Sequence, residues 1–562
     1  MSFNPGTYTV KAEGYQGPVA IKVEFSKEKI ESIEIGPNNE TKAISKPVFE
    51  RLPKRIIAGQ TLNVDPIKGA GGSSRAVLAG VAQAIDEAGG DAEEWKQRDK
   101  YEVKAVQDDW ITETDVLIMG SGGAGLSAAI EAKEAGADVL IVEQMSIIGG
   151  NTNRATGGMN AAETQYQKAM GIEDSVELFY KDTMEGGHNL NDPDLVRSLV
   201  ENSESGVEWV NTLGGDLTDV NISGGASVPR FHRSPDGKPV GPVVVETLLN
   251  KIQELNIPVL TDTAVTEILM EDDTVSGVKV ENYGETYTIS ADAVVVASGG
   301  FGANADMLRK YAPELQGSQT TNQPGATGSG INAAQGIGAE VIQMEQIQVH
   351  PTTAPGTGAL YTEGLRGDGA ILINKDGRRF VNELETRDVV VQAELEQPDG
   401  IIYMIFTQEL ADNNASTRNY IQSGVAEKAE TVEELAEKLE IDGAALKETI
   451  ATYNEYYEKG EDEAFGRTSV DLNFKEGPFY AIPVTPSVHH TMGGLKIDTG
   501  THVYDTEGRI IPGLYAAGEA TGGVHGGNRI GGNAMADIVV HGRIAGQNAS
   551  KNLKQEVLVR GK

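Results

Sequence analysis

The chain of 562 residues contains no cysteine. This absence excludes disulfide bonds, thiolate nucleophiles, cysteine-held iron–sulfur clusters and the C-x-x-C-H attachment of haem. No motif with metal-ligand spacing is visible either, so no metal site is predicted. Redox chemistry in this chain would therefore require an organic cofactor.

Long apolar runs are also missing. None approaches the roughly 18 residues that cross a bilayer, and the most apolar stretches, AVVVAS (293–298) and IIYMIF (401–406), have the length of buried strands. The first residues, MSFNPGTYTV, lack the basic and apolar regions of a signal peptide. We therefore expect a cytoplasmic protein, or a secreted or periplasmic one if a leader has been removed.

Positive charge is scarce: 47 Lys and Arg residues face 83 Asp and Glu residues, which gives a net charge of −36. This balance disfavours nucleic acids and anionic membranes as partners. It does not disfavour a small anion, because surface charge is screened over about 8 Å at physiological ionic strength. A pocket that binds an anion in this chain must be markedly basic.

The pattern of strands and helices divides the chain into several units. Residues 1–100 predict a small α+β module, with alternating strands in GTYTVKAEG, PVAIKVEFS and KIESIEIG and a helix in SSRAVLAGVAQAIDEAG. Residues 101–113 are predicted to be a linker, and a βαβ unit begins near Thr114. From about residue 347 to 486 the strands are punctuated by glycine and asparagine, and a last helix is expected from about Gly532.

The βαβ unit carries a dinucleotide motif. In TDVLIMGSGGAGLSAAIEAKEAGADVLIVEQ (114–144), Gly120, Gly122 and Gly125 have the G-x-G-x-x-G spacing between a strand and a helix, and Glu143 ends the second strand. Such glycines let the backbone approach a pyrophosphate at a helix N-terminus, and the acid is placed to bind a ribose. An ordinary glycine turn is the alternative, but the register of strand, helix and acid favours the dinucleotide site.

The rest of the chain favours FAD over NAD. GGNTNRATGGMNAA (149–162), VVVASGGFG and GLYAAGEATGG are further glycine segments that would return to the same ligand, and Glu519 is a second candidate ribose contact. No second G-x-G-x-x-G follows a strand, so no NADH site is predicted, and GATGSG (325–330) is predicted to be structural. The helix that starts near Gly532 would direct its positive N-terminus at the flavin pyrimidine. The predicted cofactor-binding residues are Gly120, Gly122, Gly123, Ala124, Gly125, Glu143, Gly149, Gly150, Asn151, Thr152, Thr156, Gly157, Gly158, Gly299, Gly518, Glu519, Gly532, Asn533 and Ala534.

With HPT (350–352), TEGLRGDGAILINKDGRRFVNELETRD (362–388), HHTMGG (489–494) and GGNRIGGNA (526–534), these segments resemble the soluble flavocytochrome c-type fumarate reductases and the wider fumarate reductase/succinate dehydrogenase flavoprotein family. The resemblance covers about residues 112–550. It implies an α/β fold with a Rossmann-like FAD-binding domain in two parts, 114–344 and 491–562, and an inserted α+β capping domain, 345–490. Relatives that attach FAD covalently use a histidine in the segment matched by 149–162. No histidine occurs there, so non-covalent FAD is expected.

Arg387 lies among Glu383, Glu385 and Asp388, and such an arginine is usually part of a solvated ion pair. The resemblance implies instead that Arg387 is the acid that protonates one alkene carbon while flavin N5 delivers hydride to the other. It further implies that Glu363 and Arg366 return the proton to Arg387. The i, i+3 spacing of this last pair also suits an ordinary salt bridge.

The resemblance also supplies candidate substrate contacts. Arg529 matches a residue that holds a carboxylate through two parallel N–H bonds, which a lysine could not do. The other matched contacts are His350, Thr362 and His489, whereas His490 and His525 are predicted to be structural. Leu360 and Tyr361 depart from the family pattern, so one wall of the pocket is expected to differ.

The N-terminal module resembles FMN-binding domains, in which a threonine of the pattern D-x-x-S-G-A-T-x-T-S esterifies the FMN phosphate. This chain has DPIKGAGGSS (65–74), with Lys68 at the first serine and Gly71 at the threonine. No phosphoester can form at Gly71. Ser73 or Ser74 could substitute, but we expect a lost or non-covalent FMN site.

The resulting prediction is FAD-dependent reduction of fumarate to succinate. Reduction of another 2-enoate, such as urocanate, acrylate or a cinnamate-like acid, is the alternative within the class. A flavin carrier or dicarboxylate-binding sensor is the alternative of another class. The predicted partners are a small dicarboxylate and an unidentified electron donor, either reduced free flavin or a reductase.

Overall fold

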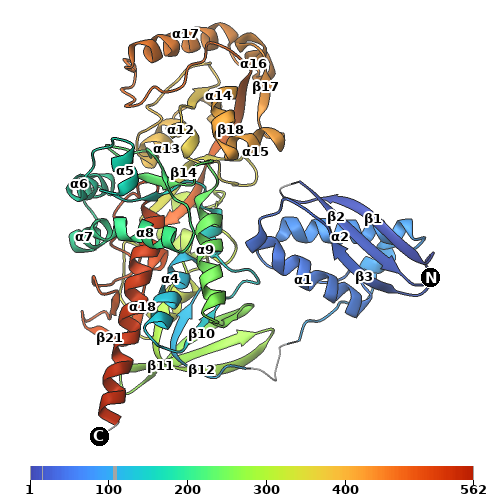
Figure 1. Cartoon of the computed structure of the whole chain (residues 1–562). Helices are drawn as coiled ribbons and strands as arrows, with labels where there is room; N and C mark the ends of the chain where they lie inside the picture. Colours follow the sequence, from blue (N-terminus) through green and yellow to red (C-terminus); the bar gives the residue numbers. More distant parts are fainter. Residues whose placement is uncertain (1, 16, 105–109, 561–562) are drawn as a thin grey trace.

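The computed structural model describes residues 2–15, 17–104 and 110–560. A small N-terminal unit, drawn in blue in Figure 1, lies beside a larger body, and the body is topped by a region built from the orange segments. The long red helix at the C-terminus runs down the body. The predicted α/β class with a separate N-terminal module is confirmed.

The N-terminal unit packs two long helices on an antiparallel sheet of order β1-β2-β3. Alternate residues of the middle strand, Val19, Ile21, Val23 and Phe25, are buried against the helices, as the period of a strand requires. Its elements are β1 (Gly6–Glu13), β2 (Pro18–Phe25), β3 (Ile30–Ile35), α1 (Lys42–Gly59), α2 (Gly71–Glu87) and α3 (Ala92–Gln97).

Two features of this unit were not expected from the sequence. Helix α1 forms despite Pro47 and Pro53 within it, because its buried residues pack on the sheet. Helix α3 lies just before the predicted linker, and it inserts Trp95 into the core of the unit. Residues 105–109 of the predicted linker lie outside the described residues.

The body is organised around an eight-stranded sheet. Strands β12, β4, β5 and β9 are parallel neighbours, β21 is parallel to the end of β12, and β10 and β11 extend the sheet antiparallel. Residues 116–119 of β4 and all of β5 are apolar and buried, as is typical of parallel strands that are covered on both faces.

The elements of the body are, in chain order, β4 (Glu113–Met119), α4 (Gly123–Glu134), β5 (Val139–Val142), η1 (Gly150–Arg154), β6 (Met159–Asn160), α5 (Gln165–Ala169), α6 (Val176–Gly186), α7 (Pro193–Glu201), α8 (Ser203–Thr212), β7 (Asp219–Asn221), β8 (Phe231–Arg233), α9 (Val240–Glu254), β9 (Val259–Leu260), β10 (Thr263–Glu271), β11 (Thr274–Asn282), β12 (Glu285–Val296), α10 (Ala305–Tyr311), η2 (Pro313–Leu315), α11 (Ser329–Gln335), β13 (Val341–Ile342), β19 (Gly494–Leu495), β20 (His502–Tyr504), β21 (Ile510–Ala516), η4 (Gly518–Ala520) and α18 (Asn533–Arg560).

The capping region is inserted between β13 and β19 and has its own sheet, β14-β18-β16-β15, with β17 also paired to β18. Its cluster of buried side chains is separate from that of the body. Its elements are β14 (Ile347–Thr353), α12 (Gly364–Gly367), β15 (Ile371–Asn374), α13 (Arg387–Leu395), η3 (Pro398–Gly400), β16 (Ile402–Thr407), α14 (Gln408–Asn413), α15 (Ala415–Gln422), β17 (Glu427–Ala429), α16 (Val432–Leu439), α17 (Gly443–Lys459) and β18 (Phe479–Thr491).

The N-terminal unit contacts the body next to the dinucleotide motif. Met145 and Ile147, which follow β5, belong to the hydrophobic cluster of the N-terminal unit. A Cβ on Gly69 would come within 2.7 Å of the Ile147 side chain, so glycine permits this close approach. Arg51 on α1 donates hydrogen bonds of 3.0 Å to both Thr261 and Asp262.

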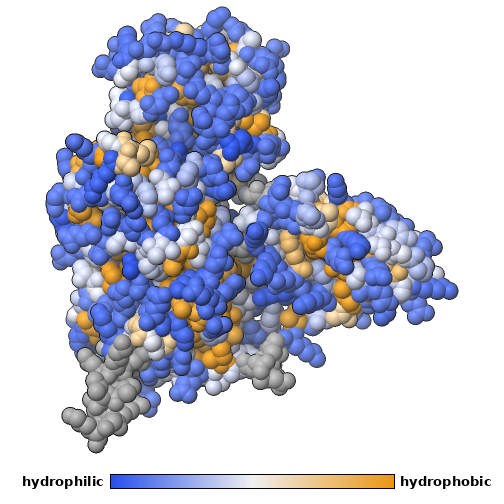
Figure 2. Space-filling model, in the orientation of Figure 1, coloured by the Kyte–Doolittle hydropathy of each residue, from blue (hydrophilic) through white to orange (hydrophobic). Residues whose placement is uncertain are grey.

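The visible surface is mainly hydrophilic, with apolar residues scattered over it (Figure 2). The many hydrophilic residues agree with the high net charge. Exposed apolar residues that occur singly are normal on protein surfaces. Among the described helices, none is both long enough and apolar enough to span a lipid bilayer.

Candidate active site

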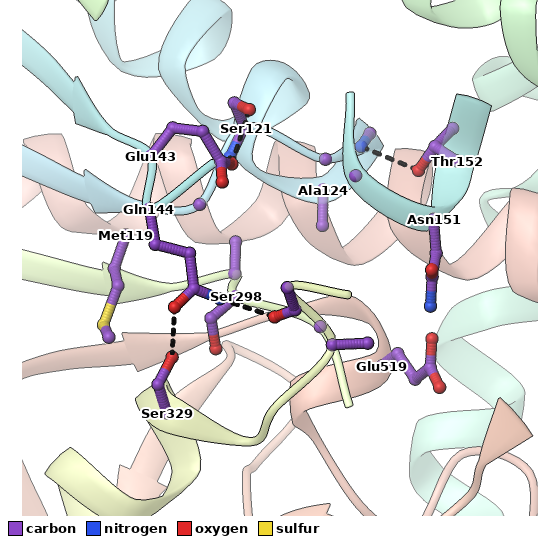
Figure 3. Close-up of a pocket in the computed structure, with 18 of the residues that line it drawn as sticks. Met119, Ser121, Ala124, Glu143, Gln144, Asn151, Thr152, Ser298, Ser329 and Glu519 are labelled. Carbon is purple, nitrogen blue, oxygen red and sulfur yellow. Dashed lines mark hydrogen bonds between the residues drawn. The ribbon is translucent and has the colours of Figure 1, made fainter. Parts of the chain in front are cut away.

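The turn between β4 and α4 opens onto a cavity of about 730 Å³ (Figure 3). Helix α4 begins at Gly123, so the positive end of its dipole faces this space, and the N–H of Gly123 donates to the Thr152 hydroxyl at 3.0 Å. A Cβ on Gly122 or Gly150 would contact only a neighbouring atom 3.7–3.8 Å away, and one on Gly299 would meet nothing within 4 Å. These open glycines and the helix N-terminus fit a pyrophosphate.

Glu143 lies at the end of β5 and lines the same cavity. Its Oε2 accepts hydrogen bonds from the backbone N–H and the hydroxyl of Ser121, at 3.0 and 2.6 Å, and its Oε1 accepts one from the N–H of Met145 at 2.8 Å. Burial raises the pKa of Glu143 despite these bonds. The carboxyl group is held rigidly, with no cation paired to it among the described residues, as suits an acceptor for ribose hydroxyls.

Most of the predicted cofactor residues line this cavity or a second one of about 860 Å³, and the two cavities share Asn151, Thr152, Glu519 and Ile538. Four of them, Gly125, Gly149, Gly518 and Asn533, line neither. Gly125 is needed for packing, since a Cβ there would lie 2.0 Å from the Gly120 carbonyl oxygen. The predicted residues that do line a cavity are Gly120, Gly122, Gly123, Ala124, Glu143, Gly150, Asn151, Thr152, Thr156, Gly157, Gly158, Gly299, Glu519, Gly532 and Ala534.

The segment 325–330 was expected to be structural, but Gly325, Ala326 and Ser329 line the first cavity. The side chain of Gln144, between the Gly325 carbonyl and the Ser329 hydroxyl, joins this segment to the end of β5 (Figure 3). A structural role was expected because no strand precedes GATGSG in the sequence. Its position beside the cavity depends on helix α11 packing under the main sheet.

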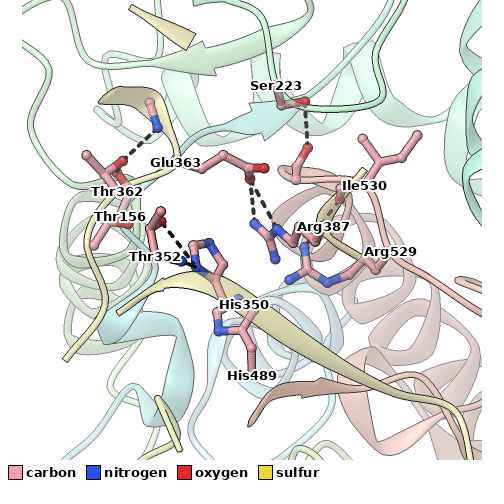
Figure 4. Close-up of polar contacts among 12 residues, drawn as sticks. Thr156, Ser223, His350, Thr352, Thr362, Glu363, Arg387, His489, Arg529 and Ile530 are labelled. Atoms are coloured by element: carbon pink, nitrogen blue, oxygen red, sulfur yellow. Dashed lines mark hydrogen bonds and ion pairs between the residues drawn. The ribbon is translucent and has the colours of Figure 1, made fainter. Parts of the chain in front are cut away.

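The second cavity is lined by Arg387 and Glu363, two of the three residues predicted to be catalytic (Figure 4). Arg387, the first residue of α13, is only 6% exposed. Its Nη2 and Nε donate to Oε2 of Glu363 at 2.6 and 3.3 Å. Glu363 also accepts, through Oε1, a hydrogen bond of 3.0 Å from Arg366. The structure thus brings Arg387, Glu363 and Arg366 into one buried chain.

None of the three carboxylates near Arg387 in sequence is its partner. Glu383 is fully buried and pairs with Arg379 and Arg467, at 2.7 and 3.2 Å. Asp388 pairs with His188 at 2.8 Å, and Glu385 is exposed. Arg387 is therefore not part of a solvated ion pair on a charged turn.

Gln348 is a positioning residue that the sequence reasoning missed. Its Oε1 accepts a hydrogen bond from Nη1 of Arg387 at 2.9 Å, and its Nε2 donates to the backbone oxygen of Arg529 at 2.6 Å. It therefore ties the two arginines together. Its place two residues before His350 in β14 puts both side chains on one face of the strand, which is the signal that could have revealed it.

Arg529 is 4% exposed and has no carboxylate partner among the described residues. Its Nη1 donates to the backbone oxygen of Ile530 at 3.3 Å, and its Nε has no partner. Burial, assisted by the nearby charge of Arg387, lowers the pKa of Arg529 to about 9. A buried guanidinium without a counter-ion is costly, and a bound carboxylate would supply that counter-ion.

The histidines at this cavity are neutral. Burial and the surrounding arginines hold the pKa of His350 and of His489 well below the usual range. Nδ1 of His350 accepts from the backbone N–H of Thr352 at 3.1 Å, and this assigns the ring proton to Nε2. Nδ1 of His489 lies 2.7 Å from the Thr321 hydroxyl. His490, expected to be structural, also lines the cavity, whereas His525 is held by Asp537 at 3.2 Å.

Thr362 lies behind the wall of the cavity. Its hydroxyl donates to the carbonyl oxygen of Thr156 at 3.1 Å and accepts from the N–H of Gly364 at 3.2 Å. Thr156 itself lines the cavity, as does Leu360. Thr362 thus fixes the wall in this conformation and does not reach into the space.

The cluster of Arg366, Arg387, Arg529 and Glu363 has more cations than carboxylates. Arg387 and Arg366 outweigh the effect of burial and lower the pKa of Glu363 to about 2, so Glu363 is ionised. These two arginines share that one carboxylate, and Glu519 and Asp537 also line the cavity and act on Arg529. Within the described parts of the chain, no group of three or more His, Asp or Glu residues could hold a metal ion.

The N-terminal unit has few groups suited to a flavin phosphoester. Gly71 begins α2 and is exposed, and a Cβ there would lie 3.5 Å from a guanidinium nitrogen of Arg75. The hydroxyls of Ser73 and Ser74 are buried, the first bonded to Glu40 and the second accepting from the N–H of Ile67. Neither serine presents a free hydroxyl to the surface.

Comparison with known proteins agrees with this division of the chain. A family model described as an FAD binding domain matches residues 115–535, and one described as an FMN-binding domain matches residues 14–86. The chain is similar to the solved structure of the open conformation of a flavocytochrome c3 fumarate reductase. That likeness has a TM-score of 0.66 and 41% identity and covers 81% of this chain and 83% of the other.

Three curated relatives have similar sequences. A fumarate reductase (cytochrome) from Shewanella frigidimarina is 47% identical over 443 residues, 78% of each chain. An NADH:fumarate oxidoreductase from Klebsiella pneumoniae is 43% identical over 98% of this chain, which spans only 59% of that relative. A urocanate reductase from Eggerthella lenta is 38% identical over 97% of this chain and 92% of its own length.

Proposed function

The chain belongs to the FAD-binding fumarate reductase family and carries an N-terminal FMN-binding domain, and from that premise we propose that it reduces fumarate to succinate. The observation that carries this proposal is Arg529, a buried guanidinium at the second cavity with no carboxylate partner among the described residues, beside the Arg387–Glu363 pair. Fumarate has two carboxylates, one for Arg529 and one for the donors His350 and His489 that line the same cavity. Acrylate, urocanate and cinnamate each carry one carboxylate and would leave one of these sets of donors without it.

Different residues would hold the two carboxylates of the substrate. Arg529 has free N–H groups for one carboxylate and would bind it through two parallel bonds. Neutral His350 and His489 would donate to the remaining carboxylate oxygens. Thr362 would not touch the substrate; its hydrogen bond to Thr156 would hold the wall of the cavity in place. Holding both ends of the molecule fixes the double bond, and positioning of this kind contributes several kcal/mol to catalysis.

Arg387 would give the proton to the substrate carbon. Gln348 and Glu363 orient its guanidinium group, so that the proton is delivered to one face of the double bond. Glu363, ionised between two arginines, would accept a proton from Arg366 as it returns one to Arg387. An arginine acid suits reduction of the double bond, since arginine holds its proton at every physiological pH.

FAD, when bound, supplies the hydride for the other carbon. The open glycines and the N-terminus of α4 fit its pyrophosphate, and Glu143 and Glu519 are placed for hydroxyl groups of the cofactor. The segment 149–162 contains no histidine, which supports FAD held without a covalent bond. The buried serines beside Gly71 likewise support an N-terminal module without covalent FMN.

The test is oxidation of reduced methyl viologen by the FAD-loaded protein with fumarate, urocanate, acrylate or cinnamate. We expect turnover with fumarate, and we expect Arg387→Ala to abolish it while FAD and succinate still bind. Near-normal turnover in that variant would refute the role of Arg387. Activity with another enoate but not with fumarate would identify the alternative substrate, and tight fumarate binding without turnover would identify a binding protein.

A further inference from the structure

Glu394 is a buried carboxyl group for which the proposed reaction has so far no use. It is 1% exposed, and neither of its oxygens has a hydrogen-bond partner in the part of the chain that the structure describes. The buried residues of α13 are Arg387, Val390, Val391 and Glu394. This i, i+3, i+4, i+7 spacing puts Arg387 and Glu394 on one face of the helix, about 10 Å apart along its axis.

Arg366 connects these two ends of α13. Its Nη2 donates to Glu363 at 3.0 Å and its Nη1 donates to the backbone oxygen of Glu383 at 2.8 Å, but its Nε has no partner. The charge of Arg366 acts on Glu394. The Nε donor of Arg366 and the carboxyl group of Glu394 thus both lack partners among the described residues, and buried atoms of this kind commonly bind an ordered water.

Glu394 differs from the other carboxyl groups around Arg366 in its protonation. Arginine neighbours lower the pKa of Glu363 and of Glu383 in spite of burial, so both are ionised. Burial raises the pKa of Glu394 well above its ordinary range, with Arg366 acting only weakly against it. Helix α13 packs against β14 and β18, whose titratable residues are Tyr480, His350, His489 and His490. None of these is among the causes of the shift, so burial is what favours the protonated form of Glu394.

A purely structural role would not explain this residue. A buried polar group without a partner destabilises the fold, and a leucine or methionine of similar size would pack there at lower cost. Glu394 also lies one residue before Leu395, which is 67% exposed at the end of α13. Glu394 thus lies in the last turn of α13, and this end of the helix reaches the surface at Leu395.

We propose that Glu394 is the entry point of the proton relay, passing protons from solvent at the end of α13 to Arg366. This rests on the proposed reductase function. As Arg387 loses an N–H proton to the substrate carbon, the ionised Glu363 accepts an N–H proton from Arg366 and passes one to Arg387, so that Glu363 is ionised again. The O–H bond of Glu394 breaks as a new N–H bond forms on Arg366 through the intervening water. Glu394 then takes a proton from solvent, so one proton passes inward per turnover and no electron moves along this path.

The experiment compares Glu394→Gln with Glu396→Gln in the FAD-loaded protein, using the enoate that the wild type reduces fastest. The first variant keeps the size and neutrality of the side chain but cannot release a proton, and the second makes the same change at an exposed position of the same segment. We expect Glu394→Gln to lower kcat at least tenfold, within the range for proton transfer groups. KM, FAD content and melting temperature should stay unchanged, and Glu396→Gln should match the wild type.

Four further measurements separate proton supply from packing. The solvent deuterium isotope effect on kcat should increase in Glu394→Gln, because proton entry becomes limiting, and small carboxylic acid buffers should restore part of the rate. Glu394→Asp, which can still carry a proton, should recover more activity than the glutamine variant. The infrared carbonyl band of a neutral carboxylic acid, measured in the wild type without substrate at pH 7, should disappear in Glu394→Gln.

The outcomes distinguish this proposal from the function on which it rests. A wild type that reduces none of the four enoates refutes the reductase function, and the relay with it. An active wild type whose Glu394→Gln variant keeps its kcat and isotope effect refutes the relay alone. Absence of the carboxylic acid band refutes it as well, because an ionised Glu394 has no proton to give.

Discussion

Arg529 provides a test in which removing a functional residue should stabilise the protein. Its guanidinium group is buried without a carboxylate partner, and burial with the charge of Arg387 lowers its pKa from 12.5 to about 9. We predict that Arg529→Met raises the melting temperature of the oxidised FAD-loaded protein at pH 7. The same substitution should abolish the binding of succinate.

The magnitude follows from the shift in pKa. A fall from 12.5 to about 9 corresponds to about 5 kcal/mol, since each pKa unit is worth about 1.4 kcal/mol. The whole cost applies at pH 7, because the group is protonated in both the folded and unfolded states below pH 9. It declines only as the pH rises above 9 and the folded protein releases the proton. Loss of the hydrogen bond to Ile530 offsets about 1 kcal/mol, so the expected net gain is about 2–4 kcal/mol.

The assay is thermal unfolding with and without succinate. A gain of this size should raise the melting temperature by about 2–3 °C in a chain of this length, and succinate should raise it in the wild type alone. Arg230→Met is the matched control, because Arg230 is equally buried but pairs with Asp174 and Asp182 at 2.8 and 2.7 Å. That variant leaves two buried carboxylates unpaired and should lose about 3–5 kcal/mol.

The result that would refute this reasoning is a lower melting temperature for Arg529→Met than for the wild type without ligand. It would mean that a partner compensates the Arg529 charge in the free protein. A succinate-induced shift that persists in the variant would show that the carboxylate binds elsewhere.

Three further predictions concern the residues around this site. Glu363→Gln should lower the free energy of unfolding by about 3 kcal/mol at pH 7, because folding lowers the pKa of Glu363 from 4.5 to about 2. The difference between variant and wild type in urea midpoint should be constant above pH 5 and shrink as the pH falls from 4.5 toward 2. Gln348→Leu should lower kcat about 10–100-fold in the viologen assay by releasing Arg387, since a hydrogen bond to a charged group contributes about 1.5–3 kcal/mol; unchanged turnover would show that Glu363 alone orients the arginine. Ser73→Ala should not change the intact mass beyond the loss of one oxygen, because its hydroxyl is bonded to Glu40 inside the module; loss of an FMN-sized mass would instead identify Ser73 as a flavin attachment site.

Local patterns predicted much of this protein because the structures they specify depend on near neighbours. The strand, glycine turn and helix at 114–134 form where the pattern indicates, since backbone freedom and side-chain periodicity act within a few residues. The α/β class and the family were confirmed from such segments. Helix α1, with its two prolines, was not predicted, because packing on the sheet overrides a weak local preference.

The partners of buried charges are the part that only the tertiary structure decided. The sequence surrounds Arg387 with Glu383, Glu385 and Asp388, yet the arginine pairs with Glu363, which lies 24 positions away. The roles of Gln348, Glu394 and the 325–330 segment were invisible for the same reason. A short motif determines the course of the backbone, but which charge meets which inside a protein depends on how distant elements pack, and burial then determines the protonation of each group.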